Sequence, residues 1–402
     1  MRARGHKVGH WLALACGLLV LAACAARAPE AGSARLPRAE LRVATFNVSM
    51  YGERAGDVLE QVRSGDPRIA RIVAVIQRVR PDVILLNEFD WTPDPALRHA
   101  FVELLRAPQP DGGDGIDYPY HHAAPVNTGY PSGLDIDGDG RTDGPADAWG
   151  FGHYPGQYGM LVLSRWPIDQ RGVRSFQTFR WAQMPGALRP AHTDGRSFYS
   201  DALWSQLRLS SKNHVDLPIQ TPSGTLHLLA MHPTPPVFDG PDDHNGKRNH
   251  DEIRLMAAYL ADADWLIDDQ GQRGGLAADA RFVVVGDLNA DPNDGDGVPG
   301  TMAQLLTHAR VNASFVPTSR GAALAAAADG PPNDRQRGDP AQDTADFAEP
   351  YAGNMRIDYV LPSVQLKPID GGVFWPAPDA SGAALADASD HHLVWLDLKW
   401  LP

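Results

Sequence analysis

Short apolar runs separated by polar turns recur along the chain from residue 41 onward. Residues 41–47 alternate apolar and polar side chains as a strand does, and residues 83–86 form the continuous apolar run that is typical of a buried strand. We predict further strands at residues 160–163, 203–209, 226–231, 282–285, 357–361 and 393–398. The pattern therefore predicts a chain rich in short strands.

Two segments have the apolar spacing of a helix instead. Asp66 and Pro67 supply an N-cap and a first-turn proline, apolar residues follow at helical spacing as far as Ile76, and Pro81 ends the helix. Residues 249–267 form a charged stretch with apolar side chains on one face, which predicts a second helix. Many strands with interspersed helices favour an α/β sandwich.

Two polar segments interrupt this pattern. Residues 108–157 are rich in Gly, Asp and Pro and have little apolar periodicity, so we interpret them as an insertion. Residues 318–351 are polar and rich in Ala and Pro, which predicts a second long loop. The chain has no internal repeat and no second composition block, and we therefore predict one domain over residues 41–402.

The N-terminus has the order of a secretory signal. Arg2, Arg4 and Lys7 precede an apolar run over residues 11–23, which is too short for a comfortable membrane span. The run ends in LAAC, which resembles the lipobox of bacterial lipoproteins and predicts cleavage after residue 23 and a lipid on Cys24. Residues 24–40 would then form the tether between membrane and domain.

The same segment sets the expected location. The residue after the cysteine is Ala25 and not Asp, which favours anchoring in the outer membrane of the cell envelope. The alternative is a secreted protein whose ordinary signal is cut near Ala23 or Ala26. Because Cys16 lies inside the signal, the mature chain would keep only Cys24 and no internal disulfide.

The charge of the chain changes the picture modestly. It carries 49 acidic and 36 basic residues, a formal net charge of −13. Net negative charge argues against a broad surface for polyanions such as nucleic acid, although a local basic groove is compatible with it.

Oxygen ligands and histidines recur where the apolar runs stop, which is where loops assemble functional sites. Each residue taken singly is an ordinary turn or cap residue, but their joint occurrence favours a site. The residues are Asn47, Glu88, His232, Asp287, Asn289, Asp358, Asp390 and His391.

Five segments carry a family resemblance. They read ATFNV at 44–48, LNEF at 86–89, GDLN at 286–289, RIDYV at 356–360 and SDHH at 389–392. In this order they resemble the motifs of the endonuclease/exonuclease/phosphatase superfamily, the deoxyribonuclease I-like proteins. The resemblance implies a four-layered α/β/β/α sandwich in which two packed, mainly antiparallel sheets are flanked by helices.

The resemblance also implies a divalent cation. Glu88 would be the principal carboxylate ligand of Mg²⁺ or Mn²⁺, and Asn47 and Asp390 would complete or support the ligand shell. Asp287 and Asn289 would orient the attacking water and hold a phosphate oxygen. The implied activity is hydrolysis of phosphate esters by in-line attack of water, as a phosphodiesterase, nuclease or phosphatase acting on nucleic acid, phospholipid or a small phosphoester.

Histidines complete the implied machinery. His391 and Asp358 resemble a pair in which the carboxylate fixes the tautomer and favours the charged ring. His232 is assigned as general acid, and its alternative is a cap on a proline-rich turn. Tyr158 resembles a tyrosine whose hydroxyl touches phosphate, and its alternative is a buried aromatic residue.

Basic residues offer a further binding element. Arg248 precedes a predicted helix whose N-terminus favours anions, so we predict a phosphate contact there, with a solvated surface as the alternative.

An acidic loop in the insertion has the pattern of a calcium loop. Asp135, Asp137, Asp139 and Asp143 alternate with Gly and other residues, but Ala146 occupies the position of the usual closing Glu. We predict a structural Ca²⁺ here; residues 291–297 are similar and less regular. A competing hypothesis for the whole chain is an inactive, calcium-binding surface lipoprotein on the same fold. We expect a monomer in either case.

Overall fold

The first strand, β1 (Leu41–Met50), lies inside a six-stranded sheet of the computed structural model, which describes residues 41–347 and 352–401. The predicted signal and tether lie outside the described residues. The strand order is β12-β13-β1-β2-β4-β3, and β1 runs parallel to β2 and antiparallel to β13. The other strands are β2 (Val83–Phe89), β3 (Tyr120–His122), β4 (Met160–Ser164), β12 (Leu366–Val373) and β13 (Val394–Trp400).

A second sheet of five strands packs against the first. Its order is β11-β8-β7-β6-β5, with β7 and β8 parallel and the other pairs antiparallel. The strands are β5 (Arg174–Ser175), β6 (His214–Thr221), β7 (Gly224–Met231), β8 (Phe282–Asp287) and β11 (Asp358–Pro362). A two-stranded ribbon, β9 (Ala345–Asp346) with β10 (Asn354–Met355), lies apart from both sheets in the pairing order.

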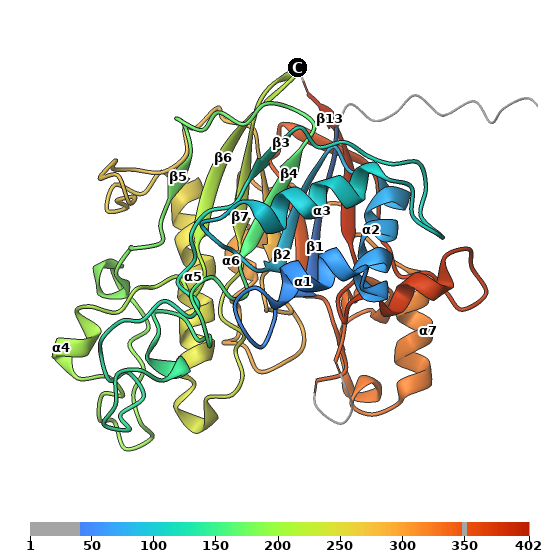
Figure 1. Ribbon diagram of the computed structural model, residues 1–402. Helices are drawn as coiled ribbons and strands as arrows, with labels where there is room; N and C mark the ends of the chain where they lie inside the picture. Colours follow the sequence, from blue (N-terminus) through green and yellow to red (C-terminus); the bar gives the residue numbers. More distant parts are fainter. Residues whose placement is uncertain (1–40, 348–351, 402) are drawn as a thin grey trace, which may run out of the picture. The chain divides into compact units, whose positions relative to one another are not determined.

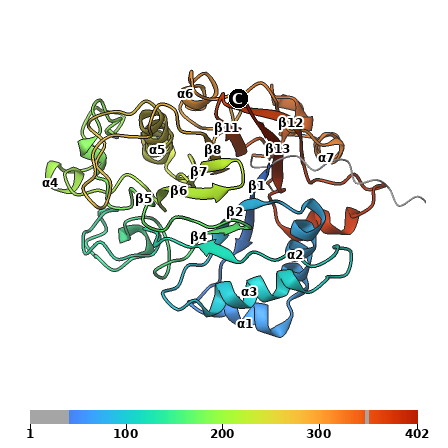
Figure 2. The same ribbon diagram turned by 90° about the horizontal axis from the view of Figure 1, so that it is seen from above.

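Helices cover the outer face of each sheet (Figure 2). On the first sheet lie α1 (Asp57–Ser64), α2 (Pro67–Val79) and α3 (Ala96–Arg106), and on the second lie α5 (His244–Leu260) and α6 (Ala303–Leu306). Two further helices are α4 (Asp201–Trp204) and α7 (Arg320–Asp329). The 3₁₀ helices are η1 (Pro145–Asp147), η2 (Trp181–Gln183), η3 (Gly240–Asp242), η4 (Asn333–Arg335), η5 (Pro340–Gln342) and η6 (Ala383–Ala388).

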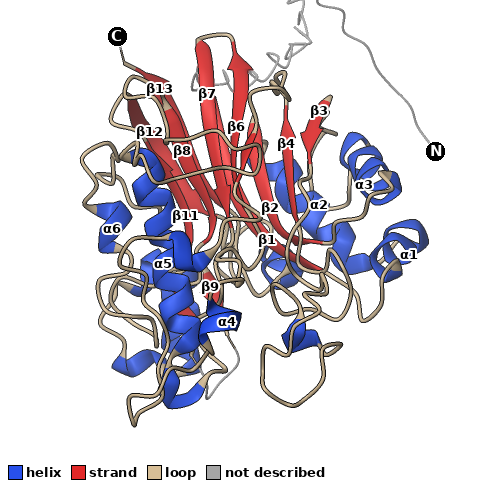
Figure 3. Cartoon of the chain, turned by 90° about the vertical axis from the view of Figure 1, so that its left-hand side faces the viewer, coloured by secondary structure: helices blue, strands red, loops and turns tan. Residues whose placement is uncertain are grey.

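Three apolar cores hold these layers together. One core lies between the two sheets and contains Leu85, Leu228 and Val285, all buried. The other two lie between each sheet and its helices, around Phe101 on one side and Ile253 on the other. Because both faces of each sheet are covered, the central strands are apolar on both sides, as their continuous runs predict. The predicted four-layered sandwich is confirmed, and Figure 3 shows its strands between helices.

Local signals explain several boundaries. The carboxylate of Asp66 accepts hydrogen bonds from the main-chain nitrogens of Arg68 and Ile69, and Pro67 opens α2, as the sequence predicts. None of the helices in the described part of the chain has the length and hydropathy of a membrane span.

Three sequence predictions about local structure are wrong. Residues 203–209 form no strand, because the Ser200 hydroxyl caps α4 and the following segment makes only an isolated bridge, between Arg208 and Arg180, with its leucines in the outer core. The loop predicted over 318–351 contains α7, which begins at the capping hydroxyl of Ser319. The helix predicted over 249–267 begins at His244 and ends at Leu260, shortly before Asp262 takes a left-handed backbone (φ 54°).

Candidate functional site

Strand register brings the predicted residues to one edge of the sandwich. Parallel pairing sets Asn47 beside Asn87, so β1 and β2 end together (lower end in Figure 1). In the second sheet β7 runs parallel to β8, and Asp287 pairs directly with Asp358 of β11. Strand ends from both sheets therefore meet, which explains why the candidate residues follow apolar runs.

Asp287 is the centre of this group. Its Oδ2 atom accepts a hydrogen bond from Asn47 Nδ2 at 3.0 Å and lies 3.4 Å from His232 Nε2 and 3.8 Å from His391 Nε2. Burial alone would raise the pKa of Asp287, but the charge of His391 and the hydrogen bond from His232 outweigh burial and lower it below the usual value. Asp287 is therefore an ionised carboxylate with three polar neighbours.

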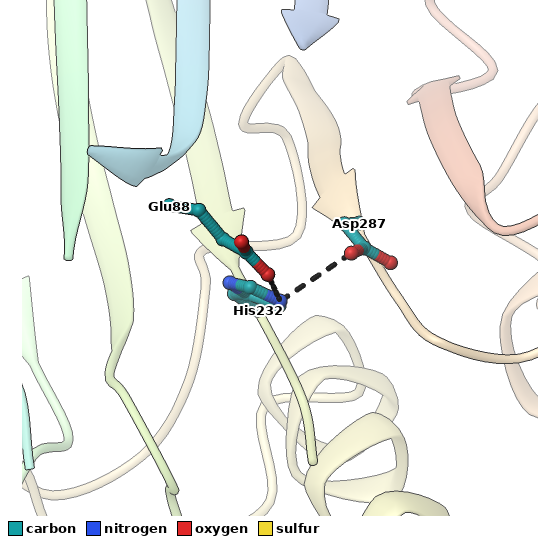
Figure 4. Close-up of side chains that lie close together, drawn as sticks. All are labelled: Glu88, His232 and Asp287. Atoms are coloured by element: carbon teal, nitrogen blue, oxygen red, sulfur yellow. Dashed lines mark ion pairs between the residues drawn. The ribbon is translucent and has the colours of Figure 1, made fainter. Parts of the chain in front are cut away.

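Glu88 faces the same His232 Nε2 atom as Asp287 does, from the other side (Figure 4), and its Oε1 atom lies 4.0 Å from that nitrogen. Its side chain retains 21 % exposure, so the carboxylate still opens to solvent. Burial raises the pKa of Glu88 to about 7, while the charge of His391 and a hydrogen bond from Asn47 act against the rise. The ionised form of Glu88 is therefore only partly stabilised by the neighbouring side chains, and a bound cation would stabilise it further.

His391 and Asp358 form the predicted pair. Their Nδ1 and Oδ2 atoms are 2.9 Å apart, and Asp358 Oδ2 also accepts a hydrogen bond from the Thr344 hydroxyl at 2.8 Å. Burial would lower the pKa of His391, but the two carboxylates of Asp358 and Asp287 raise it well above the usual value. The ring is therefore a charged donor with Nε2 directed at the site.

His232 differs from its neighbour in charge. Burial, followed by the nearby charge of Lys212, lowers the pKa of His232 to about 4, so its ring is neutral at physiological pH. A general acid must carry the proton that it gives. The role of His232 as general acid stays a prediction, and in this structure its Nε2 atom faces the Asp287 carboxylate.

Asn289 and Tyr158 lie at the edges of the site. Asp287 Oδ1 accepts a hydrogen bond from the main-chain nitrogen of Asn289 at 2.9 Å, and the Asn289 side chain donates to the Pro233 carbonyl at 3.2 Å. The half-buried Tyr158 ring packs 4.6 Å from Tyr51, and burial, with the charges of Tyr51 and Glu88, raises its pKa to about 12. Tyr158 therefore presents a protonated hydroxyl near Glu88.

Backbone strain is concentrated at the same place. Nine non-glycine residues of the described chain have positive φ, and four of them are Ser49 (46°), Glu88 (56°), Tyr158 (57°) and Asn289 (49°). Such conformations cost roughly 1–3 kcal/mol each and persist where surrounding contacts enforce them. Their clustering supports a functional role for this edge.

Asp390 is more exposed than the other candidates and joins them through Ser49. The Ser49 hydroxyl donates to Asp390 Oδ1 at 2.8 Å, and the Ser49 main-chain nitrogen donates to Asn47 Oδ1 at 3.1 Å. Asp390 therefore flanks the central group, next to Asn47.

Arg248 lies in α5 but is engaged elsewhere. Its guanidinium donates to the main-chain carbonyls of Leu209, Trp149 and Arg208 at 2.8, 2.7 and 3.1 Å. These bonds join α5 to two loops and engage the Nε and Nη2 atoms of the guanidinium. A phosphate contact of Arg248 stays a prediction.

The acidic loop brings together only part of the predicted calcium set. Ligand atoms of Asp135, Asp137 and Asp139 lie within 4.8 Å of one another, whereas Asp143 makes an ion pair with Arg141 at 3.0 Å. Bound Ca²⁺ at this loop stays a prediction, without Asp143 in the ligand set.

Sequence reasoning missed several buried partners of the site. Thr344 fixes Asp358, and Asn87 accepts a hydrogen bond from the Asp287 main-chain nitrogen at 3.2 Å. Lys212 and Glu252 are also buried next to the His232 loop. Only Asn87 carried the signal of the predicted site residues, since it follows the apolar run of residues 83–86, whereas Lys212 is followed by Asn213 and His214.

The side chains present fit a divalent cation. Ligand atoms of Glu88, His232 and Asp287 lie within 4.8 Å of one another, and those of Asp287, Asp358 and His391 form an overlapping group. Carboxylate oxygens are the donors that Mg²⁺ and Mn²⁺ prefer. A buried and a partly buried carboxylate whose ligand atoms lie this close together favour a cation between them.

The two packed sheets and the acid-lined site at their edge define a deoxyribonuclease I-like sandwich. Residues 44–391 match the endonuclease/exonuclease/phosphatase family, and the chain belongs to this family. No curated protein sequence matches the chain.

Several solved structures are similar to the chain. An endonuclease/exonuclease/phosphatase from Beutenbergia cavernae has 20 % identity and a TM-score of 0.51 over 90 % of this chain and 72 % of its own. A family protein from Leptotrichia buccalis has 15 % identity and a TM-score of 0.48 over 90 % and 100 %. A beta toxin variant from Staphylococcus aureus with bound magnesium ions has 14 % identity and a TM-score of 0.43 over 90 % and 99 %.

Proposed function

We propose that the protein is a divalent-metal-dependent phosphoesterase that hydrolyses phosphate esters by in-line attack of water. The observation that carries the proposal is the meeting of Glu88 and Asp287 with one charged and one neutral imidazole at a single edge. Family membership supports phosphate esters as the substrate class. The negative charge of the chain favours small or lipid phosphoesters over long nucleic acids.

Glu88 would hold Mg²⁺ or Mn²⁺, with Asn47 and Asp390 at its flank. The cation would supply neutralisation of the charge that builds on the phosphoryl oxygens, worth several kcal/mol. The side chains of the protein would position the attacking water and bind the phosphoryl oxygens.

Asp287, which is ionised and fixed by Asn47, accepts a hydrogen bond from the attacking water and directs it toward phosphorus. The charged His391 binds a phosphoryl oxygen through Nε2, because Asp358 occupies Nδ1. Positioning and charge stabilisation are the terms that phosphoryl transfer requires, since the reaction leaves little covalent chemistry to the protein.

The test is a substrate panel with and without chelator. Plasmid DNA, RNA, a chromogenic phosphodiester, a phosphomonoester and sphingomyelin are each offered Mg²⁺, Mn²⁺ or Ca²⁺. We expect hydrolysis of at least one substrate, its loss on chelation and its recovery with Mg²⁺ or Mn²⁺. Absence of hydrolysis in every arm, together with retained Ca²⁺ binding, would instead support the inactive calcium-binding lipoprotein.

We also propose that the mature protein is a lipoprotein of the bacterial cell envelope. The support is the LAAC sequence at residues 21–24 after a basic and apolar leader. Cys24→Ser should move the protein from the membrane fraction to the soluble fraction, as detected by immunoblot. Recovery of the unaltered protein in the soluble fraction would contradict the anchor.

A further inference from the structure

Lys212 is a buried amino group to which the proposed reaction assigns no role. It precedes β6 and is only 6 % exposed. Among the described residues, its Nζ atom makes one hydrogen bond, to the Pro233 carbonyl at 3.5 Å. An ammonium group has three donors, and burying unused donors is costly, so a second acceptor should lie close by.

The side chain of His232 offers such an acceptor. Its Nδ1 atom is buried and has no hydrogen-bond partner in the described structure. Its Nε2 atom faces the carboxylates of Asp287 and Glu88 at 3.4 and 4.0 Å, so a proton on Nε2 faces two acceptors. Nδ1 is then an acceptor that lacks a donor.

Strand register places the two groups together. His214 of β6 pairs with Met231 of β7, so the residues before His214 lie beside those after Met231. The hydrogen bond from Lys212 to Pro233, the residue after His232, joins these two segments, which together form the junction between β6 and β7.

Glu252 of α5 fixes the junction. One of its carboxylate oxygens accepts from the Ser211 main-chain nitrogen and the other from the Thr234 main-chain nitrogen, each at 2.6 Å. A single buried side chain therefore holds the neighbour of Lys212 and the loop of His232.

We propose that Lys212 is a positioning residue that donates a hydrogen bond to His232 Nδ1 through one bridging water. This bond keeps the ring proton on Nε2, where it faces Glu88, Asp287 and the bound substrate. Only its effect on turnover rests on the proposed function; the tautomer of the ring does not. A group that fixes the tautomer of a histidine in a metal site typically contributes about 10- to 100-fold to affinity or activity.

Two neighbouring hydroxyls are the competing donors. Ser211 Oγ and Thr234 Oγ1 are also buried without partners among the described residues. Ser211→Ala and Thr234→Ala are therefore the matched controls for Lys212→Met, because each removes one candidate donor from the same junction.

The test is ¹⁵N NMR of histidine-labelled, metal-free protein, in which long-range ¹⁵N–¹H couplings distinguish the two tautomers. We expect His232 to carry its proton on Nε2, Lys212→Met to shift the Nδ1 resonance and populate both tautomers, and Lys212→Arg to restore the wild-type pattern. Neither alanine control should change it. If Lys212→Met does not fold, Lys212→Gln replaces it.

Turnover provides the second readout. With the substrate found in the panel, Lys212→Met should lower kcat about 10- to 100-fold and leave KM nearly unchanged. An unchanged tautomer in the folded Lys212 variants, or a change in Thr234→Ala or Ser211→Ala instead, would overturn the proposal. Because the NMR readout needs no substrate, an inactive wild-type protein would refute the proposed function and leave the Lys212 inference testable.

Discussion

Glu88→Gln should lower turnover by about 10³-fold or more and leave the melting temperature nearly unchanged. The substitution keeps the size of the side chain and removes its charge, so the stabilisation of several kcal/mol that a held cation gives the transition state is lost. Stability should not suffer, because burial raises the pKa of Glu88 and the nearby charge of Asp287 raises it further. Initial rates at saturating Mg²⁺ and calorimetric unfolding measure the two effects.

The matched control is Glu60→Gln, which makes the same chemical change on the exposed face of α1. It should retain full turnover. A Glu88→Gln variant that turns over like this control would show that Glu88 is a structural residue.

His391→Asn should lower kcat by about 10²- to 10⁴-fold with the fold intact, the range that a positioned histidine contributes in catalysis. Asparagine is chosen because its amide keeps a donor near the position of Nδ1 for Asp358, which avoids an unpaired buried carboxylate. The loss should appear in kcat, since the charged ring acts on the phosphoryl oxygens as charge develops. Steady-state kinetics and circular dichroism provide the measurement.

His99→Asn is its control, on the exposed face of α3. Equal losses in the two variants would contradict a specific role for His391.

Much of the fold could be predicted from local sequence patterns. The capped start of α2 and the apolar runs of β1, β2, β7 and β8 are local signals, and they appear in the structure close to their predicted bounds. Residues that end buried strands could be predicted as site residues, because the ends of neighbouring strands meet at a sheet edge.

The elements that were predicted wrongly depend on contacts between segments that are distant in the sequence. The leucines of residues 203–209 have the spacing of a strand, yet Leu207 and Leu209 are buried in the outer core beside a single isolated bridge, which periodicity alone cannot distinguish from a strand. Helix α7 lies in an alanine-rich stretch between prolines, where high helix propensity and helix-breaking residues give opposite signals.

The supporting polar residues of the site escaped for a similar reason. Thr344 lies next to Ala345 of β9, which bridges to His391 in the segment before β13, and Thr344 donates a hydrogen bond to Asp358. Lys212 reaches the His232 loop through the register of β6 and β7. Neither contact produces a periodic pattern in the sequence.

The central claim is that a divalent cation binds at the edge where Glu88 and Asp287 meet. Anomalous scattering from a crystal soaked in Mn²⁺ tests it most directly, because it locates the ion independently of any substrate. We predict a peak at bonding distance from a Glu88 carboxylate oxygen in the wild-type protein, and its loss in Glu88→Gln. A peak confined to the Asp135 loop, or no peak under conditions in which hydrolysis requires Mn²⁺, would contradict the claim.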